Sequence, residues 1–216
     1  MNRLLKRTFD FVCATILLVV LSPVFLVIVA AIRLGSPGPA IFRQTRAGKG
    51  GTPFPCYKFR TMRCEVDPFG PSPKNGVDPR LTRLGRWLRE YSLDEWPQLV
   101  NIVKGDMSLV GPRPLYVSQI REWNQRQKQR LLVKPGLTGL AQVSGRGALT
   151  REEKLELDVR YVETAGLWLD GRILLTTVAQ VFGRQGIYER RYSETQSVRG
   201  EKMVRKEKSK QDRGVI

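Results

Sequence analysis

The feature that most constrains this chain is a run of 22 residues without a charged side chain, from Phe11 to Ile32. As one helix the run would reach ~33 Å at about 1.5 Å per residue, enough to cross a hydrocarbon core of about 30 Å. We therefore expect this segment to lie in a membrane. Basic residues border it on both sides: Arg3, Lys6, Arg7 and Arg33.

Ser22 and Pro23 lie at the middle of this run. Proline removes a backbone hydrogen bond and clashes with the preceding turn, so two half-helices joined by a kink are expected, each too short to span. A spanning helix would place a basic flank on the outer face, against the positive-inside tendency, whereas a hairpin keeps both flanks in the cytosol. The pattern favours a re-entrant hairpin over a spanning helix. A cleavable signal peptide is disfavoured, because its apolar region is usually roughly 7–15 residues long.

The charge balance points to an anionic partner. The chain has 37 Lys and Arg against 20 Asp and Glu, a formal net charge of +17 and no histidine. This charge would attract the phosphates of a nucleic acid, of a membrane face or of a nucleotide. Without histidine, an acid, base or nucleophile must be a carboxylate, Lys, Tyr, Ser, Thr or Cys. The three cysteines lack metal-ligand spacing, so a zinc site is not expected.

An adjacent acidic pair, Asp94 and Glu95, stands out in this basic chain. Ser92-x-x-Glu95 fits a capping box, and Pro97 is tolerated only in a first turn, so a helix should begin near Ser92 to Asp94. At that end, unpaired N–H groups and the helix dipole favour anions, phosphates included. An ionised Asp there can attack phosphorus, and a neighbouring Glu can help to hold a divalent cation.

The segments 40–46 and 54–62 read as two strands around the turn 48–51, which lacks Walker spacing. Alternation along the second strand would place Lys58 and Arg60 on one face. A helix near residues 80–89 carries a leucine stripe, Trp87 and four arginines. Its pattern fits a helix at the bilayer surface and equally a helix that packs on the core.

Two later loops could meet phosphates. Arg113 stands between two prolines, a stiff presentation of a guanidinium fork or simply a structural turn. Arg146 lies in the glycine-rich stretch 144–147, where the backbone can approach a ligand closely, or it faces water. Beyond them, Thr150-x-x-Glu153 predicts a helix start, and residues 167–182 predict a final apolar helix that carries Asp170.

These patterns predict an α+β fold, mainly helical, with a kinked re-entrant membrane helix, a small β-hairpin and interfacial amphipathic helices. We expect a re-entrant hairpin over residues 1–34, a catalytic domain on the cytosolic face over 35–185, and a basic, disordered tail over 186–216 that could touch anionic lipid.

From about Lys6 to Phe182 the chain resembles the bacterial sugar transferases, the monotopic phosphoglycosyl transferases. The resemblance implies transfer of a sugar-1-phosphate from a UDP-sugar to polyprenol (undecaprenyl) phosphate at the cytosolic face of the bacterial inner membrane. The reaction would release UMP and start the assembly of a glycan such as an exopolysaccharide. The matching motifs are Arg43-Gln44 with Arg46, Lys58 to Met62, Ser92 to Gln98, Gly105 to Pro114, Pro135 to Gly139, and Ser144 to Arg146.

The resemblance also implies roles for single residues. Asp94 would be the nucleophile that takes up the phosphosugar covalently in a ping-pong reaction, and Glu95 would assist through Mg²⁺, with both carboxylates near the metal. Asp170 matches an acidic position near the active site, and Ser22-Pro23 matches the break of a re-entrant helix. The positions that would hold phosphates are Lys58, Arg60, Arg113 and Arg146.

The chain departs from this family at Arg126-Gln127 and Arg130-Leu131, where relatives often carry Glu-Gln and Arg-His. An accessory carboxylate is missing there, which bears on sugar preference and leaves the acidic pair untouched. An alternative function is a membrane-tethered nucleic-acid-binding protein, which the charge permits. No nucleic acid is expected, because the chain lacks the usual motifs and interleaved aromatic residues. No motif encodes the sugar or the oligomeric state.

Overall fold

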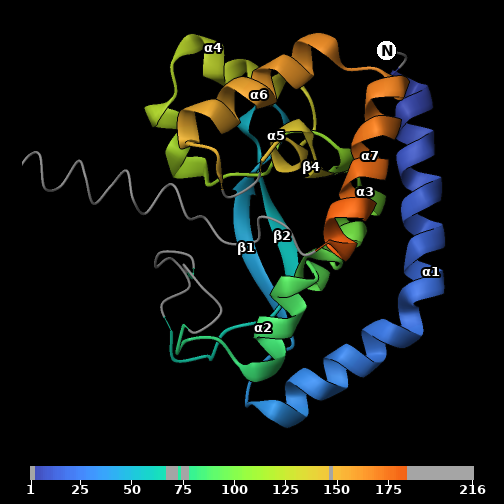
Figure 1. Cartoon of the computed structure of the whole chain (residues 1–216), viewed down its shortest axis with the longest axis vertical. Coiled ribbons are helices and arrows are strands. Elements are labelled where there is room, and N and C mark those ends of the chain that lie inside the picture. Colours follow the sequence, from blue (N-terminus) through green and yellow to red (C-terminus); the bar gives the residue numbers. More distant parts are fainter. Residues whose placement is uncertain (1–2, 67–72, 74–77, 146–147, 184–216) are drawn as a thin grey trace, which may run out of the picture.

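The computed structural model describes residues 3–66, 73, 78–145 and 148–183. The expected class, a mainly helical α+β fold with a small β-hairpin, is confirmed (Figure 1). The predicted tail 186–216 lies outside the described residues. The sequence begins with a long apolar helix, α1 (Arg3–Gly35), and the hairpin consists of β1 (Ile41–Ala47) and β2 (Pro53–Phe59).

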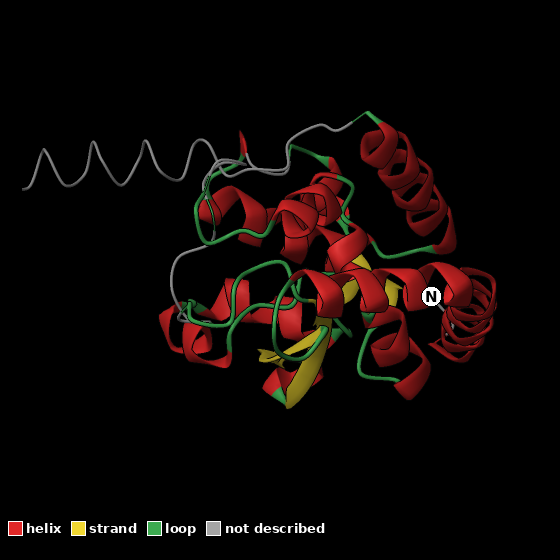
Figure 2. Ribbon diagram, turned by 90° about the horizontal axis from the view of Figure 1, so that it is seen from below, coloured by secondary structure: helices red, strands yellow, loops and turns green. Residues whose placement is uncertain are grey.

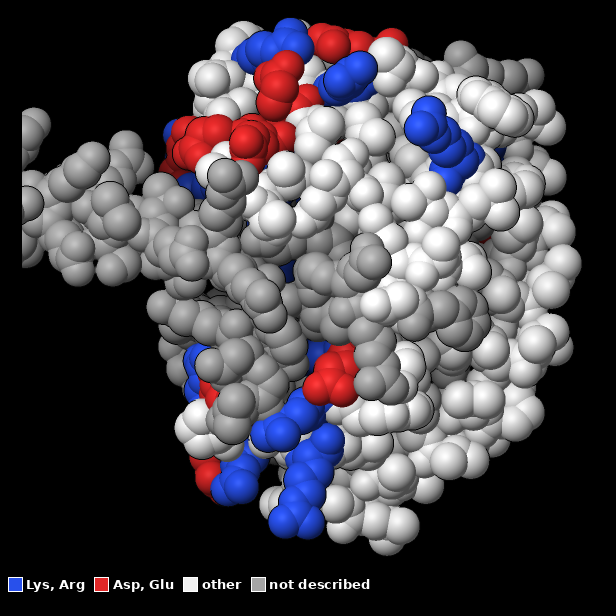
Figure 3. Space-filling model, viewed as in Figure 1, with Lys and Arg blue, Asp and Glu red and all other residues white. Residues whose placement is uncertain are grey.

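Helix α1 contains Pro23 and continues through it. Figure 1 shows the two halves of the helix at an angle, so α1 is bent rather than broken into separate helices. It is long and apolar enough to cross a membrane. Most of its apolar side chains are exposed, for example Leu26 at 71% and Val27 at 68%. Uncharged residues accordingly cover the side of the molecule that α1 forms (Figure 3).

Both ends of α1 are fastened to the same folded body. Near its beginning, Arg7 donates to the carbonyl oxygens of Ile102 and Val103 at 2.6 and 2.8 Å. At its end, Arg60 donates to the carbonyl oxygen of Ser36 at 2.8 Å. A straight spanning helix would put its two ends on opposite sides of a bilayer. These attachments instead hold both ends to one domain.

The hairpin is antiparallel, with Ile41 opposite Phe59 and Ala47 opposite Pro53. Its turn contains Gly50 and Gly51 at φ 67° and 81°, a region that favours glycine. The hairpin was predicted, but Arg60 lies beyond the end of β2 and its side chain reaches back to α1. The expectation that Lys58 and Arg60 share one strand face is therefore wrong.

The remaining helices and turns pack around the strands (Figure 2). Residues 108–110 and 136–138 form a short parallel pair that the sequence did not predict. The two strands approach so closely that a Cβ on Gly136 would lie 2.1 Å from the backbone nitrogen of Gly111. The elements are α2 (Arg83–Glu90), α3 (Gln98–Lys104), β3 (Ser108–Val110), α4 (Gln125–Lys128), β4 (Gly136–Thr138), α5 (Leu140–Val143), α6 (Arg151–Thr164) and α7 (Leu167–Phe182), with 3₁₀ turns η1 (Lys49–Gly51), η2 (Leu93–Glu95), η3 (Val117–Glu122) and η4 (Gln129–Leu132).

The two helices predicted late in the chain are confirmed. Thr150 caps α6 by accepting a hydrogen bond from the backbone of Glu153 at 3.2 Å, and the Glu153 side chain returns to the backbone of Thr150. Helix α7 runs from Leu167 to Phe182, as its apolar pattern predicted. Together with α1 and α3, these helices enclose the main core, which includes Ile102, Tyr161 and Ile173.

Candidate active site

The acidic pair lies in the 3₁₀ turn η2, between α2 and α3. Ser92, just before the turn, adopts a left-handed conformation with φ 56°, and its side chain makes no capping hydrogen bond. The predicted capping box at Ser92 and Glu95 is therefore wrong. In this conformation the Glu95 carboxylate turns away from the helix start and binds two cationic side chains.

Glu95 is held by Lys58 and Arg113. Lys58 Nζ lies 2.6 Å from Glu95 Oε1, and Arg113 Nη2 lies 2.8 Å from the same oxygen. Burial by itself would raise the pKa of Glu95, but the charges and hydrogen bonds of Arg113 and Lys58 hold that pKa well below its usual range. Glu95 is thus held as an anion by Lys58 and Arg113, and both of these side chains are of types that commonly bind phosphate.

Asp94 has a different environment, although it is the next residue. It is only 8% exposed, and within the described part of the chain its carboxylate accepts no hydrogen bond. Burial raises the pKa of Asp94 to about 6, against the attraction of Lys58 and with the repulsion of Glu95. Two adjacent carboxylates with pKa values pushed apart are typical of sites that assign different chemical roles to the two groups.

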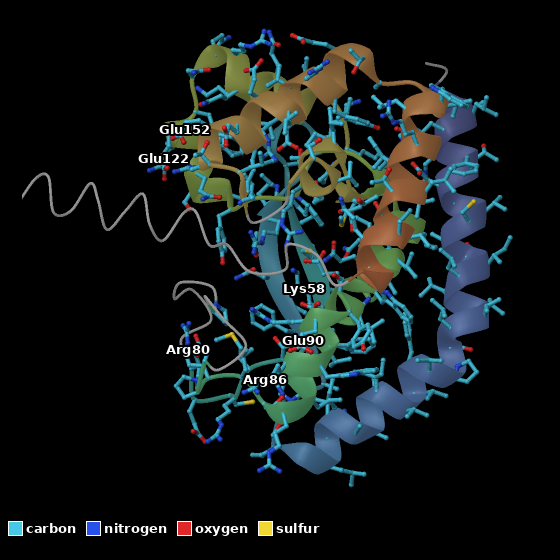
Figure 4. All side chains as sticks on the ribbon, in the orientation of Figure 1. Lys58, Arg80, Arg86, Glu90, Glu122 and Glu152 are labelled. Carbon is cyan, nitrogen blue, oxygen red and sulfur yellow. The ribbon has the colours of Figure 1, made fainter. Side chains whose placement is uncertain are left out.

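A buried asparagine fixes the geometry between the pair and the hairpin. Asn101 on α3 is fully buried, donates to the carbonyl oxygen of Pro55 at 2.7 Å and accepts from the backbone N–H of Tyr57 at 3.1 Å. Helix α3 is thereby attached to β2 one residue away from Lys58. Lys58 itself lies where the hairpin meets the helical segment of α2 and α3 (Figure 4). Asn101 was not among the predicted site residues, although a polar residue among apolar ones in a buried helix indicates a required hydrogen-bond partner.

The site adjoins the second half of the apolar helix. Trp96, next to Glu95, packs its ring 6.0 Å from that of Phe25 in α1. Phe25 also meets Phe59, at the end of β2, in an edge-on contact with ring centroids 5.5 Å apart. The acidic pair therefore lies beside the part of the molecule that is best suited to contact lipid.

The other predicted site residues lie elsewhere. Arg60 donates to the carbonyl oxygens of Ser36 and Pro37 at the end of α1, at 2.8 and 2.7 Å, so its guanidinium acts as a strut. Asp170 is buried, paired with Lys6 at 2.6 Å and bonded to the Tyr161 hydroxyl at 2.7 Å. None of these contacts reaches the acidic pair. Arg146 lies outside the described residues.

A divalent cation can be tested against the groups at this site. Among the described residues no cluster of three or more His, Cys, Asp or Glu side chains could hold a metal. Mg²⁺ is usually bound by one or two carboxylates together with substrate phosphates. Asp94, whose oxygens carry no hydrogen bond from the described residues, and the adjacent Glu95 fit that pattern. The donor set is thus suitable for Mg²⁺ that arrives with a phosphorylated substrate.

Comparison with known proteins gives a match along nearly all of the described chain. The profile of the family described as "Bacterial sugar transferase" matches residues 1–184. An uncharacterized sugar transferase, EpsL, of Bacillus subtilis is 46% identical over 186 residues, which cover 86% of this chain and 91% of that protein.

Two further relatives have names that state an activity. The UDP-glucose:undecaprenyl-phosphate glucose-1-phosphate transferase of Caulobacter vibrioides is 44% identical over 195 residues, covering 85% of this chain and 72% of the relative. The Salmonella typhimurium undecaprenyl-phosphate galactose phosphotransferase is 41% identical over 202 residues, covering 87% of this chain and 42% of the relative. The chain thus corresponds to less than half of the Salmonella protein.

Proposed function

The chain belongs to the bacterial sugar transferase family, and from this premise we propose that it transfers a sugar-1-phosphate from a UDP-sugar to undecaprenyl phosphate, the first step in assembling a glycan. Relatives named for glucose and for galactose transfer support the reaction class and leave the sugar open. The observation that carries the proposal is the acidic pair, whose two carboxylates differ in burial, partners and pKa.

In the first step, the Asp94 carboxylate attacks the β-phosphorus of the UDP-sugar. The bond from this phosphorus to the bridging oxygen breaks, and UMP leaves with the electron pair. Asp94 then carries the phosphosugar as an acyl phosphate. Asp94 suits this role because no hydrogen bond from the described residues occupies its carboxylate.

In the second step, a phosphate oxygen of the polyprenol phosphate attacks the same phosphorus. The bond to Asp94 breaks, its carboxylate is regenerated, and the product is a polyprenol diphosphate sugar. Lys58 and Arg113 are placed to exchange their contact with Glu95 for contacts with substrate phosphates and to stabilise the charge that develops on phosphorus. Two successive displacements at one site give ping-pong kinetics.

Bound Mg²⁺ would supply charge neutralisation for the diphosphate, with Asp94 and Glu95 as its protein ligands. Before such a cation arrives, Glu95 is already neutralised by Lys58 and Arg113. These two side chains thus keep an anionic site from repelling an anionic substrate. Glu95 in turn holds both cations close to Asp94 until the substrate arrives.

We place α1 as a re-entrant helix in the inner membrane, with the catalytic body on the cytosolic face. The attachment of both ends of α1 to the same domain supports this placement, as do the basic flanks of the helix. A polyprenol cannot leave the bilayer, so its phosphate must meet the nucleotide sugar at the interface. The contact of Trp96 with Phe25 would set the acidic pair at that depth. The exposed side chains of Arg83, Arg86 and Trp87 on α2 suit the same interface.

The test is intact-mass analysis of the detergent-purified protein with Mg²⁺ and pooled UDP-sugars, without polyprenol phosphate. We expect the wild type to gain the mass of a sugar phosphate and Asp94→Asn to remain unmodified. The added mass would also identify the class of sugar. UMP formation only after addition of the lipid phosphate, with no adduct, would contradict the covalent step and leave Asp94 as a metal ligand.

A further inference from the structure

The segment Pro112–Leu115, which presents Arg113 to Glu95, is held at every backbone carbonyl. Gly136 N–H donates to the oxygen of Pro112 at 2.9 Å, and Ala47 N–H donates to that of Leu115 at 2.8 Å. Arg46 donates to Pro114 O at 3.4 Å. The carbonyl of Arg113 itself accepts from Arg130 Nη2 at 2.6 Å. The segment therefore has little freedom of its own.

The group that holds the Arg113 carbonyl is itself locked in place. Arg130 Nε and Nη2 both donate to Asp158 Oδ2, at 3.1 and 2.7 Å. The side chains of Arg130 and Asp158 are only 2% and 4% exposed, and the Arg130 guanidinium lies 4.8 Å from the centre of the Trp123 ring. The pair joins η4 to α6, two elements that carry none of the acidic-site groups.

Asp158 also interacts with the backbone N–H of Arg113. Burial raises the pKa of Asp158, while the charge of Arg130 and the backbone N–H of Arg113 oppose that rise. A fully buried ion pair is seldom a net source of stability, because the loss of hydration offsets the attraction. Its position beside the segment that carries Arg113 therefore points to a role other than stability.

We propose that Arg130 and Asp158 are positioning residues that clamp the backbone of Arg113, so that its guanidinium is directed at Glu95 and at a substrate phosphate. Proline on both sides of Arg113 fixes the chain direction, and the clamp fixes its rotation about that direction. Arg130 uses the fork of its guanidinium to join a carboxylate and a carbonyl at once, which the single ammonium of a lysine does not reproduce. The inference rests on the proposed transferase function.

The main variant combines Arg130→Met with Asp158→Leu, which removes the clamp and leaves no buried charge without a partner. We expect this variant to melt close to the wild type, because apolar residues of similar volume often replace a buried ion pair without loss. Its kcat/KM for the UDP-sugar should fall at least about tenfold, because misplacing a phosphate-binding group by a fraction of an ångström is costly.

A double-mutant cycle separates positioning from a general structural effect. In the Arg113→Gln background, the same double replacement should lower kcat/KM by less than about threefold, because the guanidinium that it positions is already gone. The matched control is Arg151→Gln with Glu122→Gln. That pair joins η3 to the same helix α6 at 2.6 Å and does not touch Arg113, so activity should be unchanged.

Equal losses in both backgrounds would overturn the proposal, because the pair would then act independently of Arg113. Unchanged activity of the clamp variant would overturn it as well. If that variant does not fold, Arg130→Lys provides the same cycle, with a smaller loss expected that again vanishes in the Arg113→Gln background.

If the wild type shows no transferase activity, the proposed function is refuted, but the proposal that Arg130 and Asp158 position Arg113 is not. Hydrogen exchange then tests the clamp: the peptide covering residues 111–116 should exchange faster in the clamp variant than in the control. Equal exchange would contradict it.

Discussion

Replacing Asp94 with asparagine should abolish transfer and at the same time stabilise the folded protein at neutral pH. Asp94 is 8% exposed, and the pKa of its carboxyl rises from 3.8 to about 6 on folding. The folded state therefore holds the proton more tightly than the unfolded chain does. The contribution of Asp94 to stability therefore falls as the pH rises through this interval, because the buried carboxyl has to ionise.

The size of this effect follows from the pKa. A rise from 3.8 to about 6 corresponds to about 3 kcal/mol of destabilisation above pH 7 and to about half of that at pH 5. Asparagine is neutral throughout and avoids this cost, although its amide must still be solvated, so about 3 kcal/mol is an upper limit. For a chain of this size, the corresponding rise in melting temperature is at most roughly 6–12 °C at pH 8.

The assay is thermal unfolding of the detergent-purified wild type and Asp94→Asn at pH 8 and pH 5, with UMP release measured in parallel. The control is Glu152→Gln, an exposed carboxylate far along the chain from the site, which should shift the melting temperature little at either pH (Figure 4). The reasoning fails if Asp94→Asn melts no higher than the wild type at pH 8. It fails too if the gain does not shrink at pH 5.

Three further outcomes are expected. UMP release should decline as the pH falls through the Asp94 pKa of about 6, because only the ionised Asp94 is a nucleophile. A rate of UMP release that stays constant from pH 8 to pH 5 would contradict this role of Asp94. Glu95→Gln should retain some turnover but need more Mg²⁺, as a titration at fixed UDP-sugar would show, and an unchanged Mg²⁺ dependence would argue against metal binding by Glu95. Asn101→Ala should lower the unfolding free energy by about 2–4 kcal/mol, because it leaves the carbonyl of Pro55 and the N–H of Tyr57 buried without their partner. Urea unfolding would measure this loss, and a loss below about 1 kcal/mol would show that water replaces the amide.

Local patterns predicted several elements correctly because their causes are local. The hairpin follows from alternating side chains around a glycine turn, and the start of α6 follows from the Thr150 and Glu153 cap. The capping prediction at Ser92 failed for a physical reason. Its residue types fit, but the left-handed backbone there and the attraction of Glu95 to Lys58 and Arg113 prevailed over the local hydrogen bonds.

The sequence by itself determined that a long apolar helix with Ser22-Pro23 at its middle comes first, and it singled out Asp94 and Glu95 as the candidate reactive pair. Charge, apolar run length and residue type carry that information. Only the tertiary structure decided which cations meet Glu95, that Arg60 is a strut, and that Arg130 and Asp158 hold Arg113. These partners come together from separate elements, with Lys58 and Glu95 37 residues apart and Arg130 and Asp158 28 apart. Their pairing depends on how those elements pack, which no local pattern encodes.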